Sequence, residues 1–207
     1  LEKKYLAVIN ELYTTTEYKQ KATEAIKQIF SYLRSFSKSP VFSLFDEKEI
    51  LAQGEMIGAF ALTEPHTGSD AGAIKTRAVK DGDDYILNGA KQFITSGSNA
   101  GVIIVFAVTD PSAGKKGISA FLVPRNTPGY EVIRVEEKLG LHASDTCQIA
   151  LTDVRVHKSL MLGKEGEGLK IALANLEGGR IGIASQALGI AEGALERAIA
   201  YTKERKQ

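Results

Sequence analysis

The chain has little cysteine, little proline and no tryptophan: one, five and none among 207 residues. Because Cys147 stands alone, no disulfide can form within the chain, a composition typical of a reducing compartment. No apolar run approaches the ~20 residues that a membrane-spanning helix requires. The three histidines, His66, His142 and His157, stand far apart and no Cys-x-x-Cys pair occurs. The sequence therefore predicts neither a membrane span nor a metal site.

Neither sign of charge dominates, since 26 Lys and Arg are balanced by 25 Asp and Glu. A surface for nucleic acid or for an anionic membrane is therefore not expected. Hydrophobic residues make up 43% of the chain, which suits a globular protein with one or two cores. The chain begins with Leu1 and shows no cationic, hydrophobic leader, which predicts a mature, processed or partial chain.

Three zones differ in pattern. In residues 1–48, apolar residues recur at three- and four-residue steps after a capping box of Thr14 and Glu17, which predicts helices. Residues 49–162 hold β-rich runs at roughly ten-residue spacing, separated by turn residues. Residues 163–207 predict the start of a truncated C-terminal helical bundle. The whole favours an α+β fold, with a central antiparallel β-barrel or sandwich flanked by helices, over a doubly wound sheet.

The strand zone carries its own turn signals. Asn88-Gly89 lies between two β-rich runs and predicts a hairpin, because both residues tolerate positive φ. The Gly-x-x-Gly-x-Gly pattern of residues 163–168 does not follow a strand in a βαβ unit, so we interpret it as a loop entering a helix. That helix has a face rich in Ala and Gly, which another helix can approach closely. Further strands are expected over residues 101–110, 117–124, 130–137 and 146–156.

Five segments resemble the acyl-CoA dehydrogenase family in order and spacing, most closely its short-chain, butyryl-type branch. They are GAFALTEPHTGSDAGAIKTRA, YILNGAKQFITSG, GISAFLVPRNTPG, KLGLHASDT and GGRIGIASQALGIAEGALERAIAYTKERKQ, and the resemblance covers about residues 49–207. It implies a helical N-terminal domain, a central β-domain and a C-terminal four-helix bundle. It also implies FAD as cofactor and the α,β-dehydrogenation of an acyl-CoA thioester, with electrons passed to an electron-transfer flavoprotein.

The resemblance places the first segment along the flavin. Thr63 matches a threonine that bonds the pyrimidine end of the ring, and Leu62 would add a backbone contact. Gly68 would let the backbone approach the FAD pyrophosphate, and Ser69 matches a serine near both pyrophosphate and substrate. For this segment taken alone, a tight turn with solvated hydroxyls is the simpler interpretation.

The second implied flavin wall is the run QFIT. Thr95 matches a threonine at the N5 region, and Phe93 takes a position commonly held by tryptophan, although an ordinary buried strand aromatic remains the alternative. Arg205 matches an arginine that reaches the FAD of a neighbouring subunit, which implies a homo-oligomer, dimer or tetramer; a solvated helix charge is the alternative. The implied cofactor-binding residues are Phe60, Leu62, Thr63, Gly68, Ser69, Phe93, Ile94, Thr95 and Arg205.

For the acyl-CoA substrate, the resemblance implies Ser69, Glu177 and Arg180, the last two at the mouth of the channel. Lys115 and Lys116 could meet CoA phosphates, but a solvated hairpin tip is an equal interpretation. The compartment expected for such an enzyme is the bacterial cytoplasm or the mitochondrial matrix.

The chain departs from the family pattern in two places. The catalytic Glu of some branches directly precedes the arginine that Arg180 matches, but here that residue is Gly179, so we expect no catalytic base in this chain. Glu177 does not replace it, because two residues turn a helix by about 200°. Residues 1–48 are expected to depart from the family's N-terminal domain. A silent flavin- or CoA-binding module and an acyl-CoA oxidase therefore remain alternatives.

Overall fold

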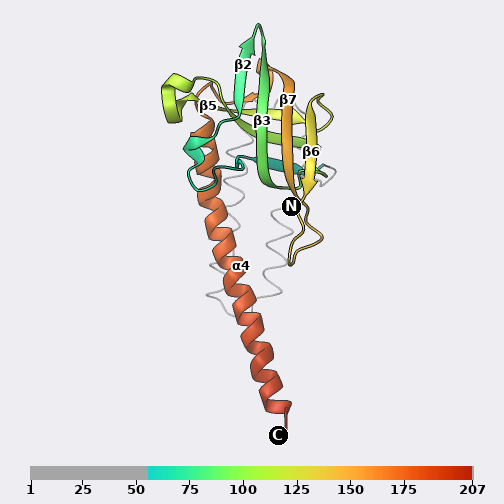
Figure 1. The fold of residues 1–207 in the computed structure, drawn as a ribbon. Helices are drawn as coiled ribbons and strands as arrows, with labels where there is room; N and C mark the ends of the chain where they lie inside the picture. The colour runs from blue at the N-terminus through green and yellow to red at the C-terminus, as the bar shows by residue number, and fades with distance from the viewer. Residues whose placement is uncertain (1–55, 207) are drawn as a thin grey trace.

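The computed structural model describes residues 56–206, and the helices expected in residues 1–48 lie outside this range. Strands fill the first two-thirds of the described chain and one long helix fills the rest (Figure 1). The strands are β1 (Gly58–Ala61), β2 (Arg77–Asp81), β3 (Asp84–Thr95), β4 (Val102–Val108), β5 (Ile118–Pro124), β6 (Tyr130–Val135), β7 (Thr146–His157) and β8 (Met161–Leu162). The helices are η2 (Ala71–Ala73), η3 (Pro111–Gly117), η4 (Lys158–Leu160) and α4 (Gly168–Glu204).

The strands form one mixed sheet in the order β6-β7-β3-β2-β4-β5-β8, with β1 added beside β4. Most neighbours are antiparallel, but β1 and β2 each pair parallel with β4. The α+β class and the four later strands are confirmed. Two points of the expected antiparallel barrel or sandwich need correction: the sheet is mixed, and it is not closed into a barrel, because the end strands β6 and β8 do not pair with each other in the part of the chain that the structure describes.

The sheet folds over on itself where β2 pairs with β4 through one residue pair, Arg77 with Val108. The two halves then face each other across the main core, where the rings of Tyr85 on β3 and Phe121 on β5 lie 5.1 Å apart. A second core lies on the opposite face of β4 and β5, where Phe106 packs with the start of α4. This two-layer arrangement is the sandwich alternative that strand spacing predicted.

The predicted hairpin at Asn88-Gly89 is wrong. Strand β3 continues through these residues, with a shift of its register against β7 between Leu87 and Gly89, and the β2–β3 turn lies instead at residues 82–83, where Gly82 has a φ of +64°. Gly89 has a different reason to be glycine: an added Cβ would lie 2.8 Å from the Thr76 Cα. The close approach of the Thr76 backbone, and not a turn, therefore explains why residue 89 is glycine.

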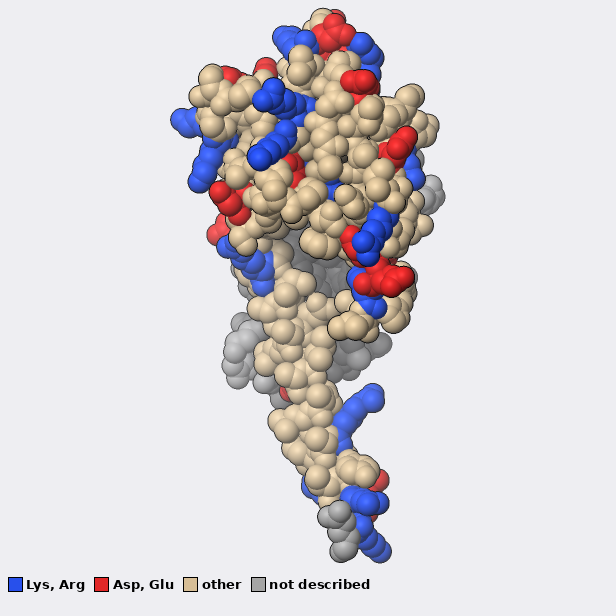
Figure 2. Space-filling model, in the orientation of Figure 1, with Lys and Arg blue, Asp and Glu red and all other residues tan. Residues whose placement is uncertain are grey.

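Helix α4 confirms the loop-to-helix interpretation and extends 37 residues, about 55 Å at 1.5 Å per residue. Its beginning is anchored on β5, since a Cβ on Gly168 would lie 2.6 Å from the Ser119 carbonyl carbon. Beyond that anchor the helix projects away from the sheet (Figure 1), and the face that Figure 2 shows carries few charged side chains along the middle of the helix. Exposed apolar side chains on it include Ile181, Ile183, Leu188, Ile190, Leu195 and Ile199. No helix within residues 56–206 is long and apolar enough to cross a membrane.

Candidate functional site

A buried ion pair joins the two segments that the sequence assigned to a flavin. Lys91 on β3 is fully buried, and its Nζ donates to the Glu64 Oε1 at 2.8 Å. The same ammonium donates to the carbonyls of Leu62 at 3.2 Å and Phe106 at 2.7 Å. All three of its hydrogens therefore have acceptors, so the charge is held without water.

The Glu64 carboxylate is equally well satisfied. Besides Lys91, it accepts hydrogen bonds from the backbone N–H groups of Lys75 at 2.6 Å and Thr76 at 3.0 Å. Burial alone would raise the pKa of Glu64, but Lys91 and these donors outweigh burial and hold the pKa below its ordinary value. Burial lowers the pKa of Lys91 to about 8, because the charge of Glu64 offsets the loss of water only in part. The pair is therefore ionised at neutral pH.

A backbone hydrogen bond continues this connection beside the ion pair. The Gln92 N–H donates to the Thr63 carbonyl at 2.9 Å. Three consecutive residues after β1, Leu62 to Glu64, are thus bonded to the consecutive pair Lys91 and Gln92. The structure therefore brings Thr63 and Phe93 onto neighbouring backbone segments, as the two implied flavin walls require.

Phe93 itself projects from an irregular stretch of β3. The register with β7 shifts between Lys91 and Ile94, and Phe93 has a φ of +58°, rare for a bulky residue. Its side chain is 63% exposed, so it is not an ordinary buried strand aromatic. A strained backbone that presents an aromatic ring to the outside is typical of ligand sites.

The turn after Glu64 places small and hydroxyl side chains at the surface. Glu64 and Thr67 exchange two backbone hydrogen bonds, at 2.9 and 3.0 Å, and Gly68 and Ser69 follow exposed. A Cβ on Gly68 would meet only the Thr63 Cγ2, at an ordinary 3.9 Å, and Gly68 has no positive φ. Neither backbone conformation nor packing within the described residues demands glycine here. The segment thus leaves room for an external group and fits a phosphate-bearing cofactor.

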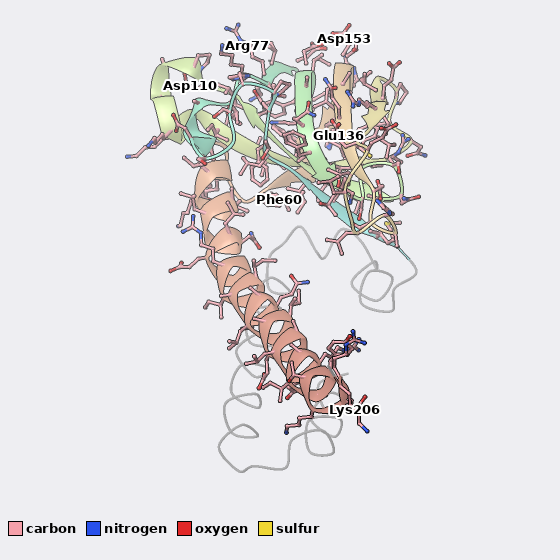
Figure 3. The ribbon with its side chains drawn as sticks, turned by 60° about the horizontal axis from the view of Figure 1, so that its bottom comes forward. Phe60, Arg77, Asp110, Glu136, Asp153 and Lys206 are labelled. Carbon is pink, nitrogen blue, oxygen red and sulfur yellow. The ribbon has the colours of Figure 1, made fainter. Side chains whose placement is uncertain are left out.

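Other implied site residues contribute less through their side chains. Ile94 and Leu62 are 2% and 5% exposed, so only their backbone could contact a ligand. Phe60 packs its ring 4.8 Å from that of Phe106 and lies on the α4 side of the sheet (Figure 3). It belongs to the second core, and a direct flavin contact by its ring is therefore not evident. Thr95 is exposed at the end of β3 and remains available to a ligand.

The residues implied for substrate and for a second subunit lie on α4. Glu177 and Arg180 are exposed and, three residues apart, share one side of the helix. Arg205 caps the far end of α4, beside Lys206, which Figure 3 shows well away from Phe60. Lys115 and Lys116 are exposed on η3, and the Lys115 side chain lies against Gly72, so the hairpin-tip interpretation agrees with their exposure.

The turn that follows Thr95 is held by a carboxylate from the start of β7. Asp145 accepts hydrogen bonds from the Ser98 N–H at 2.9 Å, the Ser98 hydroxyl at 2.8 Å and the Asn99 amide at 2.9 Å. Burial alone would raise the pKa of Asp145, but these donors hold it far below its ordinary value. The network fixes the end of β3, where Thr95 lies.

We expect Asp145→Asn to lower the free energy of unfolding by about 1–2 kcal/mol at neutral pH, because charge-assisted hydrogen bonds are lost. Since the folded-state pKa of Asp145 is depressed, its contribution is present above the ordinary value of about 3.9 and is lost as pH falls below it. Urea unfolding of both proteins from pH 7 to pH 2 measures this. If the free energies of unfolding of the two proteins differ by the same amount at every pH, the proposed contribution of the Asp145 carboxylate is contradicted.

Sequence reasoning missed Glu64, Lys91 and Asp145. A signal for Lys91 existed, because it continues the inward-facing alternation of Tyr85 and Leu87 along β3. A lysine at an inward position requires a buried partner. Nothing in the sequence identified Glu64 as that partner, 27 residues away.

Comparison with known proteins agrees with this geometry. The family model for the acyl-CoA dehydrogenase middle domain matches residues 59–154, and the model for the C-terminal domain of the same family matches residues 166–207. The chain belongs to the acyl-CoA dehydrogenase family. The family predicted from the five sequence segments is confirmed.

Two curated relatives illustrate how far the likeness extends. An acyl-CoA dehydrogenase of Bacillus subtilis is 46% identical over 98% of this chain and 53% of its own length. A short-chain specific acyl-CoA dehydrogenase of Clostridium acetobutylicum is 54% identical over 76% of this chain and 41% of its own length. This family member therefore spans about half the length of these relatives. The first alignment extends into residues 1–48, which both family models leave unmatched, so the departure of this segment from the family stays a prediction.

Solved structures give the same result. Butyryl-CoA dehydrogenase from Megasphaera elsdenii superposes with a TM-score of 0.74 at 50% identity, covering 76% of this chain and 42% of that one. A chain in a structure described for the electron transferring flavoprotein of Acidaminococcus fermentans gives a TM-score of 0.74 at 45% identity, covering 97% of this chain and 46% of that one.

Proposed function

We propose that this acyl-CoA dehydrogenase chain forms the FAD- and thioester-binding core of an enzyme that desaturates short-chain acyl-CoA. One observation carries the proposal: the Glu64–Lys91 pair sets the Thr63 and Phe93 segments side by side, with Phe93 presented outward. The names of relatives that act on short-chain acyl-CoA support the substrate class. Their bacterial and mitochondrial sources support a bacterial cytoplasm or a mitochondrial matrix.

Within this proposal each part of the site has a task. The Thr63 and Thr95 hydroxyls would bond the flavin edge, and Phe93 would cover one face of the ring. Gly68 and Ser69 would receive the pyrophosphate, and Glu177 with Arg180 would line the acyl-CoA entrance. When bound, FAD would supply a hydride acceptor. An electron-transfer flavoprotein would then take the electrons, and Arg205 would reach the site of a second copy.

The test is the visible spectrum of the FAD-loaded 207-residue chain during anaerobic addition of butyryl-CoA. We expect the flavin bands to shift as the thioester binds but not to bleach, because residue 179 is glycine where some branches carry the base. A spectrum that does not respond to butyryl-CoA would contradict thioester binding. Bleaching would show that the chain contains a base after all.

Gly179 also supports a second candidate function, that of a flavin-binding chain without catalytic activity. An added Cβ at Gly179 would meet nothing within 4 Å, so nothing within the described residues requires glycine. Gly179→Glu separates the two functions. Butyryl-CoA should bleach the flavin of this variant if the chain is an incomplete dehydrogenase, and should leave it unchanged if the chain is a silent module. Oxygen uptake during turnover would indicate an oxidase instead.

A further inference from the structure

We infer that the Glu64–Lys91 ion pair is a positioning element for the flavin site, fixing the distance between its two backbone walls. This inference rests on the proposed function and adds two residues to it. Neither residue is placed against the cofactor. Glu64 acts through Thr63, the residue before it, and Lys91 acts through Phe93, two residues after it.

Energetics alone do not explain the pair. Replacing a buried ion pair by apolar residues of similar volume is often neutral or stabilising, so a pair of this kind is weak evidence for stability. The side chains of Lys91 and Glu64 are only 0% and 2% exposed. The pair supplies something that an apolar pair cannot: each of its hydrogen bonds fixes an angle as well as a distance between the segments that it joins.

The bonds of the pair extend to four separate segments. Lys91 lies on β3. Its ammonium donates to the Leu62 carbonyl, just after β1, and to the Phe106 carbonyl on β4. Glu64 binds the N–H groups of Lys75 and Thr76 just before β2. Four chain segments therefore meet at one buried charge pair, and the Thr63–Gln92 hydrogen bond lies directly beside it.

The strain at Phe93 needs such an anchor. A positive φ at a bulky residue costs of order 1–3 kcal/mol and persists only where the surroundings determine it. Lys91, two residues earlier, is fixed by three hydrogen bonds, and Asp145 holds the turn that begins three residues later. Loosening the Lys91 anchor would let β3 relax toward regular register, moving Phe93 away from Thr63.

The test compares Glu64→Gln and Lys91→Met with a matched core variant, Leu87→Ala. Leu87 is also fully buried on β3 but lies four residues before Lys91, about 13 Å along the strand. All three variants should lose stability. Only the two pair variants should weaken FAD binding at least tenfold relative to Leu87→Ala and shift the flavin absorption bands.

Amide hydrogen exchange provides a readout that needs no cofactor. In Glu64→Gln the Gln92 amide should exchange at least tenfold faster than in Leu87→Ala, while the Val105 amide in the core exchanges alike in both. If Lys91→Met does not fold, Glu64→Gln decides alone. Equal Gln92 exchange and equal FAD affinity in Glu64→Gln and Leu87→Ala would overturn the inference. A wild-type chain that binds no FAD would instead contradict the proposed function, and the exchange rates would then decide whether the pair positions the walls.

Discussion

The substitution Gly68→Val is expected to weaken FAD binding at least about a hundredfold, roughly 2.7 kcal/mol. The proposed site brings the pyrophosphate against the bare backbone at this position, and a branched side chain would occupy that space. The fold should not change, because the new Cβ would meet only the Thr63 Cγ2 at 3.9 Å and the φ is not in the left-handed region. We therefore expect the free energy of unfolding to stay within about 0.5 kcal/mol of the wild type.

Titration of the apo-chain with FAD, followed by the quenching of flavin fluorescence, measures this effect. Gly178→Ala provides the control, because its added Cβ meets nothing within 4 Å and the residue lies on α4, away from the proposed pyrophosphate site. It should leave FAD affinity unchanged and stabilise the helix by up to about 1 kcal/mol. If Gly68→Val binds FAD as tightly as Gly178→Ala does, the phosphate end of the cofactor does not lie at Gly68.

The substitution Lys91→Met is expected to lower the free energy of unfolding by about 3–5 kcal/mol. It would leave the buried carboxylate of Glu64 without its cation and two carbonyls without their donor. Lys158→Met is a matched control, because Lys158 also forms an ion pair at 2.8 Å, with Asp83. That pair is exposed, with side chains 55% and 72% accessible, so its loss should cost far less than the loss of the buried pair.

Urea denaturation of both variants at pH 7 measures the difference. The same substitution thus removes a cation from a buried pair and from an exposed pair of equal length. Similar midpoints for Lys91→Met and Lys158→Met would mean that burial of the Glu64–Lys91 pair has no energetic consequence. The expected cost of leaving the Glu64 carboxylate buried without its cation would then be contradicted.

Much of the fold follows from local sequence signals. β-rich runs separated by turn residues predicted the positions of β4, β5, β6 and β7, and the helical repeat predicted α4. The Asn88-Gly89 hairpin failed because glycine has two uses that look alike in sequence, a turn and a close approach. Gly89 serves the second, against Thr76, a contact that depends on tertiary structure.

The candidate site was likewise predicted only in part. The motif matches implied that Thr63 and Phe93 lie on two walls of one site, and the Gln92–Thr63 hydrogen bond makes their backbone segments neighbours. The ion pair that joins the segments was not predicted, because Glu64 and Lys91 are surface residue types by composition and their pairing is a long-range contact. The left-handed backbone of Phe93 likewise depends on a bulge against β7, which no local pattern specifies.

The most direct test of the central claim is the visible absorption spectrum of the purified chain after incubation with FAD and removal of free cofactor. If the Thr63 and Phe93 segments, joined by the Glu64–Lys91 pair, form a flavin site, the protein fraction should keep the yellow flavin bands. The Glu64→Gln variant should retain much less bound flavin. A folded wild-type chain that emerges colourless, at every FAD concentration tried, would contradict the account.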